Sequence, residues 1–78
     1  MSKAFGERLR KLRTTRTNYT GEQMAEFLNT DLKTYNEFET GKKEPSMYRM
    51  LLLAKVLEVD FAKLMEYEED NNIISAQK

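Results

Sequence analysis

The side chains with the most usable chemistry gather between residues 20 and 41, in the stretch TGEQMAEFLNTDLKTYNEFETG. Tyr35 and Phe38 have the i, i+3 spacing of an apolar helix face, so the other positions of a helix over 32–39 point outward. The outward residues are Leu32, Lys33, Asn36 and Glu37. A helix that enters the major groove of DNA by its N-terminus presents such residues to the bases. Lysine can donate to guanine, asparagine can bond adenine, glutamate can accept from the cytosine amino group, and leucine can pack on the thymine methyl.

A second group of residues could hold the phosphates of a nucleic acid. Helix N-termini offer backbone amides, and basic side chains in the adjoining loops offer charge. The residues in such positions are Arg16, Thr20, Gly21, Glu22, Lys42, Lys43 and Ser46. Both groups also fit a plainer interpretation, in which these are ordinary solvent-facing side chains and a solubilising loop.

The elements that would position these residues are helical. Phe5, Leu9 and Leu12 repeat at helical spacing and predict a helix over 3–15, followed by a polar, β-branched loop at 14–18. A capping box formed by Thr20 and Gln23 predicts a second helix over 21–28.

The remaining boundaries follow from caps and breakers. Asn29 tolerates the left-handed conformation that a tight turn needs, Asp31 can cap the helix over 32–39, and Gly41 ends that helix. Ser46 precedes a strong apolar pattern over 47–57, and Asp60 precedes a short one at 61–65. No strand pattern remains, so the predicted fold is all-α with about five helices.

Composition narrows the chemistry. The 78 residues include neither cysteine nor histidine, which excludes disulfides and metal sites built on thiolate or imidazole ligands, and no metal or other cofactor is expected. No apolar run approaches the roughly 20 residues of a membrane span, and no signal peptide is evident, so a cytoplasmic location is expected.

Charge is distributed unevenly along the chain. The net charge is zero, but residues 1–43 carry nine basic groups against six acidic ones, and residues 44–78 carry four against seven. A distribution of this kind can hold one face of a protein near phosphates.

The chain resembles the Cro/C1-type helix-turn-helix family of bacterial and phage transcriptional regulators over about residues 5–65. The resemblance rests on an ordered series of residues: Leu9, Arg13, Thr20, Met24, Ala25, Tyr35, the sequence FETG at 38–41, Pro45, Ser46, Leu51, Ala54, Lys55 and Leu57. The chain departs from the family's pattern in three places. One extra residue lies between Arg13 and Thr20, Gly21 stands where the family often has glutamine, and Asn29 stands where the turn usually has glycine.

The resemblance implies a compact, lambda-repressor-like bundle over residues 1–66, with an acidic and polar tail at 67–78. It implies sequence-specific binding of double-stranded DNA, most simply by a repressor, with 32–39 as the recognition helix and no enzymatic activity. It also implies a partly buried ion pair between Arg13 and Glu39, and a homodimer through the C-terminal helix region. Candidates for that contact are Met65, Tyr67, Ile73 and Ile74.

One alternative belongs to a different class of function. The neutral net charge, the acidic second half and Glu37 also suit a protein-interaction module on the same fold, such as an antitoxin, an antirepressor or a co-regulator.

Overall fold

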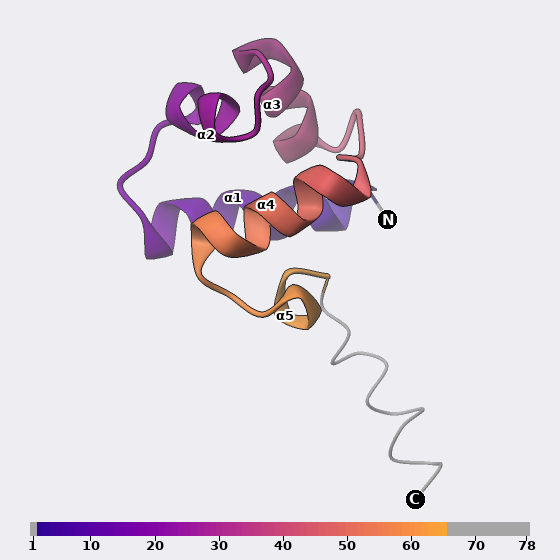
Figure 1. The fold of residues 1–78 in the computed structure, drawn as a ribbon. Coiled ribbons are helices and arrows are strands. Elements are labelled where there is room, and N and C mark those ends of the chain that lie inside the picture. The colour runs from indigo at the N-terminus through magenta and orange to yellow at the C-terminus, as the bar shows by residue number, and fades with distance from the viewer. Residues whose placement is uncertain (1, 66–78) are drawn as a thin grey trace, which may run out of the picture.

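A computed structural model describes residues 2–65 as five α-helices and no strands (Figure 1). The helices are α1 (Ser2–Arg16), α2 (Gly21–Phe27), α3 (Leu32–Thr40), α4 (Met47–Leu57) and α5 (Phe61–Met65). In Figure 1, α2 and α3 lie on one side of α1, α5 lies on the opposite side, and α4 packs against α1 and α5. The predicted all-α fold is confirmed. The predicted tail at 67–78, with Tyr67, Ile73 and Ile74, lies outside the described residues.

The apolar residues of all five helices meet in one core. The buried set is Phe5, Leu9, Leu12, Met24, Ala25, Leu28, Tyr35, Phe38, Met50, Leu53, Ala54, Leu57 and Leu64. Because these residues repeat at helical spacing, each helix buries one stripe and leaves its other face outside. That division leaves the opposite face of α3 open.

Capping hydrogen bonds begin α2 and α3, the two helices on either side of the central turn. The Thr20 hydroxyl accepts a hydrogen bond from the Gln23 amide at 3.1 Å, and the Gln23 side chain accepts one from the Thr20 amide at 2.9 Å. The predicted capping box is therefore present. The Asp31 carboxylate accepts from the Thr34 amide at 2.7 Å and begins α3 in the same way.

Three residues with positive φ end helices. Asn29 lies at φ 56° in the turn between α2 and α3, and Gly41 lies at φ 84° just after α3. Both fit the sequence prediction, because asparagine and glycine adopt this conformation most readily. Glu58 also lies at φ 56°, after α4, where its side chain makes the conformation costly.

Helix α1 and the end of α3 approach each other very closely at Gly6. A Cβ atom at this position would lie 2.5 Å from the carbonyl oxygen of Glu39 and 2.6 Å from that of Phe38. Since real Cβ atoms do not come so near to backbone, only glycine fits. This contact fixes the position of α3 on α1.

The prediction of a loop at 14–18 is wrong for its first three residues, because α1 continues to Arg16. The hydroxyls of Thr14 and Thr15 donate to the backbone oxygens of Arg10 and Lys11, at 3.0 Å and 2.7 Å. Bonding of this kind to the preceding turn satisfies polar, β-branched residues inside a helix. These threonines are therefore compatible with a helix and do not indicate a loop at this position.

Three arginine side chains bond the carboxyl ends of other helices. Arg8 donates to the Leu64 oxygen in α5 at 3.1 Å. Arg16 donates to the Leu57 and Glu58 oxygens at the end of α4, both at 3.0 Å. Arg49 donates to the Leu28 and Asn29 oxygens after α2, at 2.9 Å and 3.0 Å. Cations at these positions satisfy carbonyls that lack helical partners and oppose the helix dipole.

Candidate nucleic-acid interface

The outward face of α3 is accessible along its length. Tyr35 and Phe38 are buried, whereas Lys33, Asn36 and Leu32 are exposed, Leu32 to 39%. The same face borders an open hollow of about 450 Å³, lined by Leu32, Lys33, Asn36, Glu37, Thr40 and Lys42. The structure thus brings all four predicted base-contact residues and Lys42 to one surface.

The start of α2 adjoins this surface through Gly21. A Cβ atom at Gly21 would lie 3.3 Å from Leu32 Cδ1 and 3.6 Å from Asn36 Oδ1. A side chain at this position would therefore press on Leu32 and would meet Asn36 at an ordinary van der Waals distance. Glycine at this position leaves the Leu32 side chain room.

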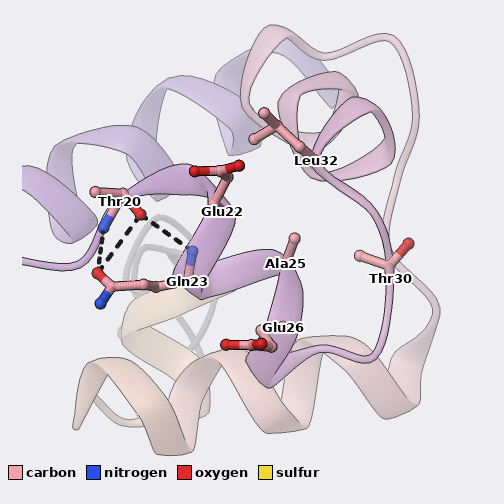
Figure 2. Close-up of a pocket in the computed structure, with 7 residues that line it drawn as sticks. All are labelled: Thr20, Glu22, Gln23, Ala25, Glu26, Thr30 and Leu32. Carbon is pink, nitrogen blue, oxygen red and sulfur yellow. Dashed lines mark hydrogen bonds between the residues drawn. The ribbon is translucent and has the colours of Figure 1, made fainter.

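A second hollow, of about 630 Å³, lies between α2 and the start of α3 (Figure 2). Leu32 lines both hollows, so they meet at this residue. The other residues around it are Thr20, Glu22, Gln23, Ala25, Glu26 and Thr30. Glu26 did not stand out in the sequence, although it lies one helical turn after Glu22 and therefore on the same side of α2.

The capping box limits what Thr20 can offer a ligand. Its hydroxyl and its amide both bond Gln23 (Figure 2). The amides of Gly21 and Glu22 follow it in the first turn of the helix, where backbone donors lack helical acceptors. At this end of α2 the backbone is thus better placed than the Thr20 side chain to meet a phosphate.

Glu37 is less outward than its position in the sequence predicts. Its side chain is only 21% exposed and lies 3.5 Å from the Lys43 ammonium. Its Oε1 atom is buried and accepts no hydrogen bond. Glu37 and Lys43, which were both predicted to contact DNA, therefore face each other.

The remaining predicted phosphate contacts are separated by the fold. Lys42 lies beside the α3 hollow, and Ser46 caps α4 by accepting from the Arg49 amide at 3.3 Å. Arg16 is not in the loop before α2, as the sequence suggested. It is the last residue of α1, and its guanidinium bonds the end of α4.

Lys33 has a charge partner within the protein. The N-terminus of a helix disfavours a cation, yet Lys33 is the second residue of α3. The neighbouring Asp31 carboxylate offsets this cost. Hydrogen bonds from Thr34 hold the pKa of Asp31 below its ordinary value, and the positive charge of Lys33 lowers that pKa further.

An ion pair ties α3 to α1 behind this surface. Arg13 Nε donates to Glu39 Oε2 at 2.7 Å, and Arg13 Nη2 donates to Glu39 Oε1 at 3.3 Å. The side chains are 17% and 8% exposed. The hydrogen bond to Glu39 raises the pKa of Arg13 above its ordinary value. This is the pairing that the family resemblance implies.

The Tyr35 hydroxyl completes the network by donating to Glu39 Oε2 at 2.6 Å. Burial, reinforced by this bond, raises the pKa of Tyr35 far above its ordinary value, so the phenol keeps its proton. The i, i+4 spacing of Tyr35 and Glu39 within one helix was a signal for this contact. The network holds the inner side of α3 and leaves its outer side available.

Two further site classes find no support within residues 2–65. No group of three or more acidic side chains is placed to hold a metal ion there. No helix among these residues is both long and apolar enough to cross a membrane.

Comparison with known proteins agrees with the geometry. A helix-turn-helix family model matches residues 9–64. The restriction-modification controller protein C.AhdI from Aeromonas hydrophila has a similar structure, with a TM-score of 0.71 and 31% sequence identity over 80% of this chain and 88% of that one. Curated protein sequences gave no match. The chain therefore belongs to the Cro/C1-type helix-turn-helix family, and it is a DNA-binding transcriptional regulator.

Proposed function

We propose that this protein is a repressor that binds a two-fold related operator as a homodimer, with one α3 in the major groove of each half-site. It acts in the cytoplasm of a bacterium or of a phage-infected cell and blocks a promoter by occupying it. The observation that carries the proposal is the open face of α3, where Leu32, Lys33 and Asn36 lie together beside the first turn of α2. The likeness to a controller protein supports a regulatory role.

Each outward side chain of α3 contacts a different type of base. Lys33 donates to guanine O6 and N7, Asn36 bonds adenine, and Leu32 packs on a thymine methyl. Glu37 accepts from the cytosine amino group, with Lys43 beside it to reduce repulsion from nearby phosphates. Each good base contact is worth about 1–3 kcal/mol of discrimination.

Contacts to the phosphates set the register of the protein on DNA. Lys42 and Lys43 supply positive charge after α3, and Gly21 and Glu22 supply backbone amides. Thr20 and Ser46 contribute mainly by holding the first turns of α2 and α4. Arg16 has no part in this interface, because its guanidinium is held at the end of α4.

The test begins with the selection of sites from a pool of random duplex DNA over several rounds. We expect a palindromic sequence, and we expect its affinity to fall steeply with salt as bound phosphates release counterions. The selected site is then measured against Lys33→Ala, which should lose discrimination at one base position. Lys42→Ala should instead weaken binding to all sequences and reduce the salt slope by about 1.

A matched control is Lys63→Ala. Lys63 is an exposed lysine on α5, and α5 lies across α1 from α3. This variant changes the net charge by the same amount and should bind DNA as the parent does. Failure to enrich any sequence at low salt, or equal losses in Lys33→Ala and Lys63→Ala, would contradict the proposed readout.

A protein-interaction module is the second candidate function. Glu22 and Glu26 line the hollow in Figure 2 beside the exposed Leu32, an arrangement that suits a partner with basic and apolar groups. The two functions differ in one measurement, because only the DNA regulator has an affinity for duplex DNA that depends on salt.

A further inference from the structure

The side chain of Arg49 connects α4 to the turn between α2 and α3. Its Nε atom donates to the Leu28 oxygen at 2.9 Å, and its Nη2 atom donates to the Asn29 oxygen at 3.0 Å. The backbone of α4 packs chiefly against α1 and α5. Arg49 therefore carries the influence of α4 to a turn that its own backbone does not pack against.

The two oxygens that Arg49 bonds follow the last helical carbonyls of α2. The amides of Asn29 and Thr30 bond the Glu26 and Ala25 oxygens, at 3.1 Å and 2.9 Å, and so close the end of the helix. Carbonyls at a helix end lack helical donors, and an unpaired carbonyl costs free energy where water is excluded. A helix as short as the seven-residue α2 also depends on contacts outside itself. The guanidinium supplies both needs.

The turn held in this way includes a residue in a costly conformation. Asn29 lies at φ 56°, where any side chain is less favourable than glycine. The planar guanidinium donates through two nitrogens at once, so it fixes the direction of the two carbonyls as well as their position. Arg49 itself extends from a fixed point, because the Ser46 hydroxyl accepts from its amide at 3.3 Å and the next residue, Met50, is buried in the core.

The position of the turn decides where α3 begins. Two residues separate Asn29 from Leu32, the first residue of α3, and the second of them, Asp31, caps that helix at 2.7 Å. A rotation of the Asn29 carbonyl therefore passes directly to Leu32 and Lys33, which lie on the outward face of α3. A shift of about 1 Å is enough to weaken a contact that requires a fixed geometry.

We propose that Arg49 is a positioning residue for DNA recognition, which contacts no base and sets the position of α3 by holding the turn before it. The inference rests on the proposed function, in which α3 reads the bases. It extends that function to a residue of α4. Loss of Arg49 should therefore reduce the discrimination between DNA sequences more than it reduces the affinity for DNA in general.

The first test compares the affinity for the selected site with that for a random duplex, at a temperature where circular dichroism shows every variant to be folded. Arg49→Met should weaken binding to the selected site about 10-fold more than binding to the random duplex, because base contacts are lost and phosphate contacts remain. Arg49→Lys, which keeps the charge and one donor group, should recover part of this ratio.

A matched control is Lys55→Met, which removes one positive charge from the exposed side of the last turn of α4. It should leave the ratio of the two affinities unchanged. A purely structural or electrostatic role for Arg49 would weaken binding of the folded protein to both duplexes equally. Equal losses in Arg49→Met, or the same loss of ratio in Lys55→Met, would overturn the proposal.

The second test needs no DNA, so that failure of the inference and failure of the proposed function are separate results. The Thr30 amide, which bonds the Ala25 oxygen at 2.9 Å, reports on the turn in native-state hydrogen exchange. It should exchange about 10-fold faster in Arg49→Met than in the parent, and at the parent's rate in Lys55→Met. An unchanged rate in Arg49→Met would overturn the inference, whereas a parent protein that binds both duplexes equally would contradict the proposed function.

Discussion

Glu39→Gln tests the link between α1 and α3 with little change of shape. The carboxylate accepts hydrogen bonds from Arg13 at 2.7 Å and 3.3 Å and from Tyr35 at 2.6 Å. Glutamine keeps the size of the side chain and one acceptor oxygen, but it removes the negative charge. It also brings an amide NH₂ group next to donors that need acceptors. The variant therefore leaves the Arg13 charge without its counterion.

The size of the effect follows from the burial of the pair. Breaking a buried ion pair by removing one partner costs about 3–5 kcal/mol. Arg13 is 17% exposed and also donates to the Tyr19 oxygen at 3.1 Å, so it is not left wholly unpaired. We therefore expect the lower end of the range, about 3 kcal/mol in the free energy of unfolding. For a domain of this size, such a loss lowers the melting temperature by about 12–24 °C.

Urea unfolding followed by circular dichroism measures the loss. Tyr35→Phe is the control, because it removes one hydrogen bond and no charge, and it should cost about 1–2 kcal/mol. Arg13→Leu combined with Glu39→Leu should be more stable than either single leucine variant, since no buried charge is then left alone. A change below about 1 kcal/mol in Glu39→Gln would refute the reasoning, because burial would then not make the pair important.

Two further predictions concern the backbone. Gly6→Ala should lower stability by about 1–3 kcal/mol or more, because its methyl group would lie 2.5 Å from the Glu39 carbonyl oxygen; an unchanged melting temperature would show that α1 can move away at no cost. Glu58→Gly should raise stability by about 1 kcal/mol, because it relieves a side chain held at φ 56°. Glu58→Ala, which keeps the Cβ atom, should give no such gain in the same thermal melts.

Much of the fold was predictable because it depends on local rules. The spacing of Tyr35 and Phe38 was sufficient to turn Leu32, Lys33 and Asn36 outward, and the caps at Thr20 and Asp31 placed the starts of α2 and α3 correctly. Local rules did not predict that the Glu37 side chain is half-buried. Its burial depends on the path of the loop after α3, which brings Lys43 close to Glu37.

The arginines illustrate the same limit more generally. The sequence has an excess of basic residues over 1–43, which suggested charge available for phosphates. In the structure, Arg8, Arg13 and Arg16 all bond groups elsewhere in the protein. A long cationic side chain can reach many acceptors, and only the packed arrangement of the helices decides which one it meets. Positive charge in a sequence is therefore not the same as positive charge at a surface.

These arginine bonds also bear on how the domain folds and unfolds. Helical domains are usually dominated by contacts between near neighbours in the chain, which favours rapid folding. Here the bonds made by Arg8, Arg16 and Arg49 join residues 56, 41 and 21 positions apart. Opening α5 or the end of α4 therefore breaks a hydrogen bond to α1 as well, which couples the stability of these helices. In native-state hydrogen exchange, the Leu64 amide, which bonds the Asp60 oxygen at 3.0 Å in α5, should share the opening free energy of α1.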